Sequence, residues 1–182
     1  GYSVSLSTDG SVVAIGALRN DGDDGNNKGH VRIYQNVGGT WTQVGSDIDG
    51  EWNIDANSGY SVSLSANGSV VAIGAPYNPG KRTASGHVRI YQNVGGTWTQ
   101  VGSDIDGEIS GELSGSSVSL SADGSVVAIG APYNPGVGTI SGQVRIYQNV
   151  GGTWTQVGSD INGEASGDLS GSSVSLSAAV SY

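Results

Sequence analysis

The sequence contains no cysteine, which excludes disulfide bonds, thiolate zinc sites and a cysteine nucleophile. It has only seven basic residues against 16 acidic ones, for a formal net charge of −9. A surface of this charge repels phosphate backbones and anionic membranes, so we expect no nucleic-acid partner. No run of 18 apolar residues occurs, so we expect no membrane-inserted segment. Divalent cations and basic surfaces suit this chain better as partners.

The sequence is also poor in proline and rich in glycine. Four prolines stand against 32 glycines, and no long stretch is rich in leucine, glutamate, lysine or alanine. Serine, threonine and valine are frequent instead. Short strands joined by tight turns suit this composition better than helices do. The composition therefore predicts an all-β protein.

Internal repetition is the strongest signal in the chain. The segment "VRIYQNVGGTWTQVGSDI" is identical at 31–48, 88–105 and 144–161. A second segment, "GYSVSLS" or "GSSVSLS", occurs at 1–7, 59–65, 115–121 and 171–177. The repeats follow one another at intervals of 58, 56 and 56 residues, and a period of this length indicates an array of similar structural units. We therefore divide the chain into repeats 1–58, 59–114 and 115–170, followed by the first strand of a partial fourth repeat at 171–182.

Each repeat contains four strand-like runs, which in the second copy are 60–65, 69–75, 87–92 and 97–102. Asn67-Gly68 separates the first two runs, and we expect a two-residue hairpin turn with positive φ at both positions. Four strands in a repeat of this length match a propeller blade. We therefore predict a β-propeller-type array of four-stranded antiparallel blades, three repeats plus a partial fourth. A sandwich or another β-repeat array is the alternative.

The second repeat carries a resemblance to a known family. "SGYSVSLSANGSVVAIGAP" at 58–76, followed by "GHVRIYQ" at 86–92, resembles the FG-GAP repeat of integrin α-chain propellers and related secreted proteins. The Gly-Ala-Pro element is literal at 74–76 and 130–132. The resemblance implies a propeller fold, an adhesive role and an extracellular or cell-surface location. The family's calcium loop between the first two strands is replaced here by a short Asp-Gly or Asn-Gly turn, so the resemblance implies no metal site at that turn.

An acidic segment after the fourth strand-like run recurs in every repeat. Its side chains stand at relative positions 1, 3, 5 and 9, which is the oxygen spacing of a calcium loop, although the glycine follows position 3 instead of position 5. The candidate ligands are Asp47, Asp49, Glu51 and Asp55; Asp104, Asp106, Glu108 and Glu112; and Asp160, Asn162, Glu164 and Asp168. The other interpretation is a solvated blade connection, whose charge keeps the protein soluble and discourages edge pairing.

Three further loops are candidates for binding. A single acidic stretch at 20–29 carries Asp21, Asp23, Asp24 and Asn26, as either a second cation loop or a flexible connection. The loops at 76–86 and 132–142 differ between copies, and binding surfaces are commonly built from variable loops on a rigid scaffold. The side chains there most able to contact a partner are Tyr77, Lys81, Arg82 and Tyr133. Unconstrained drift of the loop sequences would give the same variation.

The aromatic and histidine residues bear on two other functions. Trp41, Trp98 and Trp154 recur with "GGTW" and would form either a carbohydrate-stacking ladder or a packing contact within each blade. His30 and His87 occupy a position where the third copy has Gln143, so they make poor general bases. The carboxylates repeat in every unit, whereas an active site normally breaks such symmetry. On these grounds we expect no enzyme.

Three blades leave two blade faces uncovered, because propellers usually close with about four to eight blades. We therefore expect the partner to be another copy of the chain or further repeats of a longer one. The leading hypothesis is a noncatalytic extracellular or cell-surface repeat module with an adhesive or scaffolding role, with calcium as its only candidate cofactor. A purely structural self-assembling module is the alternative, and a glycan-binding lectin comes third.

Overall fold

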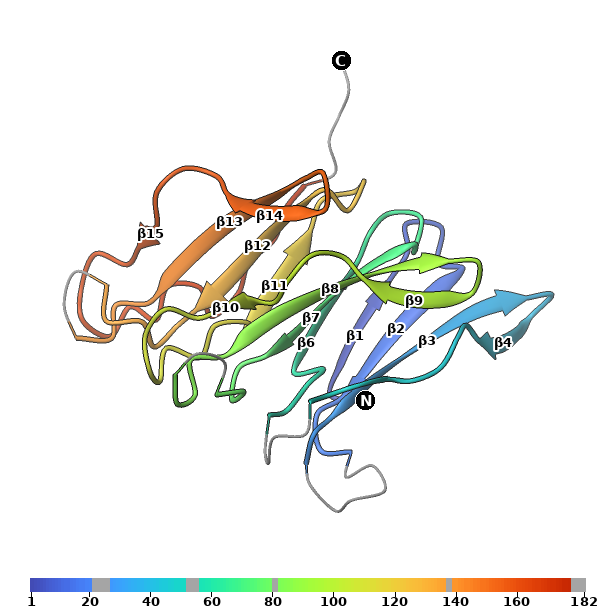
Figure 1. Cartoon of the computed structure of the whole chain (residues 1–182), viewed down its shortest axis with the longest axis horizontal. Coiled ribbons are helices and arrows are strands. Elements are labelled where there is room, and N and C mark those ends of the chain that lie inside the picture. Colours follow the sequence, from blue (N-terminus) through green and yellow to red (C-terminus); the bar gives the residue numbers. More distant parts are fainter. Residues whose placement is uncertain (21–26, 52–55, 80–81, 137–138, 178–182) are drawn as a thin grey trace.

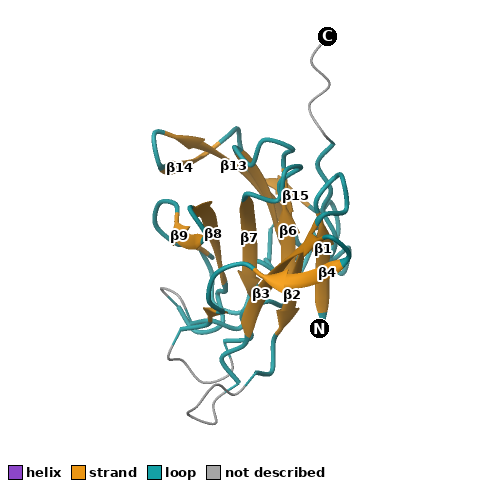
Figure 2. Ribbon diagram, turned by 90° about the vertical axis from the view of Figure 1, so that its right-hand side faces the viewer, coloured by secondary structure: helices purple, strands orange, loops and turns teal. Residues whose placement is uncertain are grey.

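A computed structural model describes residues 1–20, 27–51, 56–79, 82–136 and 139–177 of the chain. These residues form three β-sheets that lie side by side and contain no helix, so no helix that could cross a membrane is found among them (Figures 1 and 2). Each repeat supplies one sheet, here called a blade. Blade 1 contains β1 (Ser3–Leu6), β2 (Val12–Ala17), β3 (His30–Val37), β4 (Thr40–Gln43) and β5 (Ile48–Asp49). Blade 2 contains β6 (Ser61–Leu64), β7 (Val70–Ala75), β8 (His87–Val94), β9 (Thr97–Gln100) and β10 (Ile105–Asp106). Blade 3 contains β11 (Ser117–Leu120), β12 (Val126–Ala131), β13 (Gln143–Val150), β14 (Thr153–Gln156) and β15 (Ile161–Asn162).

The first four strands of each blade form the predicted antiparallel meander. In blade 2 the order is β6-β7-β8-β9, and Val62 pairs with Ile73 while Tyr91 pairs with Gln100. The acidic segment departs from the expected connection, because its first part is a short fifth strand. β10 pairs with the opposite end of β8 from β9, so that Ile105 lies beside Val88 and is buried. The apolar isoleucine inside the acidic stretch is what anchors this strand.

The two hairpin turns of each blade differ from one another. Gly38 and Gly39 between β3 and β4 have φ values of 60° and 89°, which is the two-residue turn with two positive φ values. The expectation of such a turn at Asn67-Gly68 is wrong, since only Gly68 has a positive φ. There the Asn67 Oδ1 accepts hydrogen bonds from the Ser65 hydroxyl and the Ser69 amide, which closes a longer loop between β6 and β7.

Neighbouring blades pack face to face through two apolar clusters. Between blades 1 and 2, Val12, Ile33 and Ile48 meet Val62 and Leu64. The same positions one repeat later form the cluster between blades 2 and 3. Fully burying one such side chain stabilises the fold by about 1.5–3 kcal/mol. The second strand of blade 2, β7, is buried along its whole length because both of its faces meet other strands, whereas β2 of blade 1 alternates between buried and half-buried residues.

The blades approach so closely because each second strand contains a glycine. A Cβ on Gly74 would overlap the carbonyl oxygen of Gly115, at the start of the next repeat. Beside it the Ser61 hydroxyl donates to that same carbonyl at 2.8 Å. The hydrogen bond recurs from Ser3 to Gly59 and from Ser117 to Gly171, both at 2.8 Å. Residues 171–177 of the partial fourth repeat therefore lie against blade 3 as the first strand of a next blade would.

Candidate functional site

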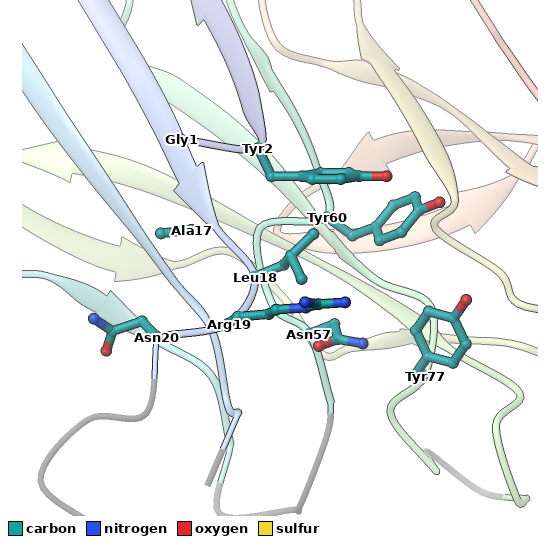
Figure 3. A pocket seen from close by; sticks show the side chains of 9 residues that line it. All are labelled: Gly1, Tyr2, Ala17, Leu18, Arg19, Asn20, Asn57, Tyr60 and Tyr77. Carbon is teal, nitrogen blue, oxygen red and sulfur yellow. The ribbon is translucent and has the colours of Figure 1, made fainter. Parts of the chain in front are cut away.

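A pocket of about 980 Å³ lies where β2, β6 and β7 of blades 1 and 2 meet their loops (Figure 3). Tyr2 precedes β1 and Tyr60 precedes β6 at the same repeat position, so stacking of the blades brings their ring centroids to 5.0 Å. Tyr77 follows β7, and its ring centroid lies 6.2 Å from that of Tyr60 in an edge-on arrangement. Leu18 and Arg19 extend across the floor of the same pocket.

The Tyr60 hydroxyl of this pocket stays protonated at physiological pH. A hydrogen bond with the Tyr2 side chain, followed by partial burial, raises the pKa of Tyr60 to about 12. A protonated hydroxyl both donates and accepts hydrogen bonds, while the ring offers apolar area. Blade 3 has Ser116 at the position of Tyr60, so the pairing of two tyrosines is confined to blades 1 and 2. The pocket can bind a ligand that combines a flat or apolar group with polar edges.

Of the four side chains predicted to contact a partner, one lines this pocket. Tyr77 does so and is exposed. Tyr133 is equally exposed but stands outside the pocket lining. Arg82 lines a second cavity of about 560 Å³, together with Glu108 and Trp154. Lys81 lies outside the described residues. Sequence reasoning missed Tyr2 and Tyr60, although a tyrosine at the same place in two consecutive repeats was a usable signal.

The acidic segments distribute their carboxylates between two blades instead of around one centre. In blade 2, Asp104 accepts a hydrogen bond from Gln100 at 2.7 Å and lies 3.6 Å from the Nδ1 atom of His87. Glu108 and Glu112 turn to the next blade, where each lies 3.2 Å from the guanidinium of Arg145. Glu108 and Glu112 are positions 5 and 9 of the acidic segment. The guanidinium of Arg145 therefore supplies the positive charge that neutralises these two carboxylates.

Glu112 is the most enclosed of these carboxylates. It is fully buried, and its oxygens accept hydrogen bonds from the Glu108 amide at 2.6 Å and from the Asn134 side chain. Burial raises the pKa of Glu112, and its hydrogen bonds and the charge of Arg145 oppose that rise. The arrangement is that of a structural ion pair between blades.

The other copies show the same pattern where they are described. Asp47 lies 2.9 Å from Arg32 and accepts from Gln43 at 2.7 Å, and Asp160 accepts from Gln156 at 2.7 Å. Glu51 reaches Arg89 of the next blade at 3.9 Å. Glu164 is exposed, as is Asp168, which accepts from the Ala165 amide at 2.7 Å. The position 3 residues Asp49, Asp106 and Asn162 end the fifth strands β5, β10 and β15. Asp55, and Asp21, Asp23, Asp24 and Asn26 of the other acidic stretch, lie outside the described residues.

Two groups among the described residues bring three metal-ligating atoms within 4.8 Å of one another. They are His30 with Asp47 and Asp49, and His87 with Asp104 and Glu51 of the preceding blade. Neither group is the 1-3-5-9 set, because each contains a histidine of the third strand. Burial first, and then a neighbouring arginine, lowers the pKa of each histidine, which leaves a neutral imidazole able to bind a metal. The calcium interpretation of the acidic segments stays a prediction.

The repeated tryptophans pack at the blade interfaces. The indole Nε1 of Trp98 donates to the Val44 carbonyl of blade 1 at 2.9 Å, and Trp154 donates to Val101 of blade 2 at 2.9 Å. Both rings pack against the apolar clusters between blades. Trp41, at the same position in blade 1, is exposed. The geometry thus gives Trp98 and Trp154 a packing role.

This chain is similar to known proteins in its structure. No protein-family model and no curated protein matches the sequence. Two bacterial proteins provisionally described as 6-phosphogluconolactonases have similar structures. The one from Bacteroides fragilis gives a TM-score of 0.59 at 14% identity, over 88% of this chain and 38% of its own. The one from Bacteroides uniformis gives 0.60 at 13% identity, over 88% and 40%. Saccharomyces cerevisiae Sqt1 gives 0.50 at 14% identity, over 85% and 33%.

These propeller-like neighbours, together with the four-stranded antiparallel meander of each of the three sheets, confirm the predicted all-β, β-propeller-type array. At 13–14% identity the likeness shows the fold alone. The chain spans about two fifths of the length of the two bacterial proteins.

The expectation that the chain is not an enzyme is overturned by the same comparison. Two of the neighbours carry an enzyme's name, so an array of this fold is compatible with catalysis. The error lay in treating repeated carboxylates as evidence against an active site. Loops that differ between blades can build an asymmetric site on a symmetric scaffold, as the tyrosine pocket of blades 1 and 2 illustrates.

Proposed function

We propose that the chain is part of a β-propeller-type repeat protein that acts as a binding scaffold with an adhesive role. The observation that carries the proposal is the pocket of Tyr2, Tyr60 and Tyr77, to which two adjacent blades contribute. Exposed tyrosines are favoured at recognition surfaces, because the ring supplies apolar contact area and the hydroxyl supplies a hydrogen bond. Arg19 adds a positive charge, so the pocket suits an aromatic or acidic segment of a protein partner.

The blades contribute rigidity to this role. The pocket residues flank strands that are held by backbone ladders and by buried packing on the neighbouring blade. A rigid site loses little conformational entropy when a partner binds. The resemblance to FG-GAP repeats supports an extracellular or cell-surface location, and the acidic surface suits a partner with basic groups around the docked segment.

The test is a binding screen with the whole chain immobilised, against panels of extracellular proteins and of glycans. We expect a protein partner whose binding is weakened about tenfold or more by Tyr77→Ala and by Tyr60→Ala. Tyr133→Ala is the matched control, since Tyr133 is an exposed tyrosine at the same repeat position as Tyr77 but outside the pocket. Binding of a glycan, lost in the Tyr77 variant, would favour a lectin instead. A chain that binds neither panel would favour the purely structural module.

A further inference from the structure

The two end blades leave exposed the side chains that the internal interfaces bury. Val4 of blade 1 is 67% exposed, whereas Val62, its equivalent in blade 2, is 9% exposed. Ile161 of blade 3 is 55% exposed, whereas Ile105 of blade 2 is 6% exposed. We call the open side of blade 1 the leading face and define it by Val4, Leu6, Arg32 and Trp41. We call the open side of blade 3 the trailing face and define it by Val157, Ile161, Glu164 and Asp168.

The charged groups at the two faces follow the same rule. The Arg145 side chain is 1% exposed because Glu108 and Glu112 of blade 2 enclose it. The Arg32 side chain, at the same repeat position in blade 1, is 44% exposed and is paired with Asp47 of its own blade. Glu164 and Asp168, which correspond to Glu108 and Glu112, are exposed at the trailing face. The leading face therefore lacks acidic residues of a preceding blade, and the trailing face lacks an arginine of a following one.

The polar contacts of the tryptophans complete the match. At both internal interfaces an indole donates to the valine carbonyl that follows β4 or β9 of the preceding blade. Trp41 is exposed at the leading face, and Val157, which follows β14, is exposed at the trailing face. Each face thus presents one half of an interface that this chain already forms twice.

We propose that the trailing face of one copy of this chain binds the leading face of a second copy, with the geometry of the contact between blades 2 and 3. Trp41 then donates to the Val157 carbonyl of the other copy. Arg32 leaves Asp47 and pairs with Glu164 and Asp168 of the other copy. The apolar residues of the two faces leave water together, which is the main favourable contribution. Opposite charges at the edge set the register of the two blades.

One strand must be exchanged for the faces to meet. Residues 171–177 already occupy the first-strand place beside blade 3, where the Leu176 amide donates to the Ser119 hydroxyl at 2.9 Å. The β1 strand of the arriving copy needs the same place. Residues 173–176 have the sequence of β1, so they replace it against β2 of the second copy with the same backbone pairing. Val174 and Leu176 then stand at the places of Val4 and Leu6 in the interface, and β1 of the second copy is released. The exchange conserves the hydrogen bonds of the strand and leaves face burial as the net gain.

The interface joins two different faces, so it generates either a closed ring or an open array. Two copies supply six blades, which lies within the range of closed propellers. We therefore expect a dimer of twice the 18.3 kDa of one chain. The exchange also moves Tyr2, which immediately precedes β1, away from Tyr60. Tyr77 follows β7 and lies outside the exchanged strand, so Tyr77→Ala should associate as the unmodified chain does.

The test is sedimentation velocity on the full chain over a wide range of concentrations. We expect mass to rise with concentration, and we expect Arg32→Glu and the double variant Glu164→Arg, Asp168→Arg each to weaken association on the order of tenfold or more. Mixing these two variants restores opposite charges across the interface and should restore association. All three side chains are exposed, so the variants should keep the circular dichroism of the unmodified chain.

Val37→Asp is the matched control, because Val37 is 62% exposed and its equivalents Val94 and Val150 are equally exposed in the other blades. It should associate normally. A chain that stays monomeric at every concentration overturns the proposal. So does association that is insensitive to both charge reversals, or that Val37→Asp weakens as much as they do.

Cysteine cross-linking tests the strand exchange, and the absence of native cysteines makes the result clean. Ser5 pairs with Ala14 in blade 1, and Ser175 takes the place of Ser5 in the exchange. The variant Ser175→Cys, Ala14→Cys should therefore form a covalent dimer under mild oxidation. The variant Ser5→Cys, Ala14→Cys is the control, because these two residues pair within a monomer and should form a disulfide within one chain. Association of the first variant without a covalent dimer would overturn the exchange.

Discussion

Arg145 on β13 and Glu112 in the connection from blade 2 lie 3.2 Å apart, and both side chains are fully buried. Replacing Glu112 by alanine leaves the guanidinium with Glu108 as its remaining ionic partner. Loss of one member of a buried pair costs about 3–5 kcal/mol. We therefore expect Glu112→Ala to lower the free energy of unfolding by about that amount in urea titrations. In the monomer at low protein concentration, Asp168→Ala at the same repeat position removes an exposed carboxylate and should change stability by about 0.5 kcal/mol or less. Equal losses in both variants would contradict a special role for the buried pair.

Gly74 sets the distance between blades 2 and 3. Alanine at this position places its Cβ against the Gly115 carbonyl, so the blades must separate or the strand must shift. Overpacking of this kind costs about 1–3 kcal/mol. We expect Gly74→Ala to lower the urea midpoint accordingly. Gly130→Ala makes the same overlap with Gly171, but only the segment 171–177 needs to move, so its loss should be smaller. A larger loss in the Gly130 variant would contradict this assignment.

His87 makes the stability of the fold depend on pH. Burial, and then the charge of Arg89, lowers its pKa in the folded state, while Asp104, Glu51 and Asp106 oppose that shift. A lowered pKa means that the unfolded chain takes up the proton first as pH falls below about 6.5. Stability is therefore full above that pH and declines as pH falls from there toward the folded pKa.

The variant that tests this dependence is His87→Gln, because blade 3 carries Gln143 at the same buried position. Urea titrations at neutral and at mildly acidic pH should show a smaller loss of stability in the variant than in the unmodified chain. His30 is less buried and remains in both proteins, so it cancels in the difference. An unchanged pH dependence in the variant would assign the effect to other groups.

Calcium removal separates the two interpretations of the acidic segments. Arg145 and Arg89 already neutralise the carboxylates that face the next blade. We therefore expect a chelator, or added calcium, to shift the thermal midpoint by less than about 2 °C, which for a chain of this size corresponds to about 0.5–1 kcal/mol. A fall of several degrees in chelator that calcium restores, and that Asp104→Asn abolishes, would establish a calcium site.

The blades could be predicted from sequence because their pattern is local. Alternating Val62 and Leu64, the apolar run 69–75 and the glycines of "NVGG" specify strands and turns within a few residues. The turn at Asn67 was misjudged because its side chain bonds to Ser65 and Ser69 and so selects a longer loop. Ile105 was read as part of a connection because its pairing partner, Val88, is distant in sequence.

The candidate sites were harder to predict because they combine residues of different blades. In the sequence, Arg145 is a polar residue in an alternating strand and gives no sign of being buried. It is buried because Glu108 and Glu112 of blade 2 enclose it. Tyr2 and Tyr60 form a pocket because consecutive blades stack in register. Spacing along one segment cannot show contacts of this kind.

Among the described residues, the main contacts of each blade are with the blade or blades beside it, and β6 packs against both β1 and β11. Such an array behaves as a nearest-neighbour system, in which stability is the sum of unit terms and coupling terms. Blade 2 packs against two neighbouring blades, and blade 1 packs against one. Blade 3 packs against one blade and against the single segment 171–177. The central unit should therefore open last, and amide exchange should be slowest in β7 and β8 although all three units have nearly the same sequence.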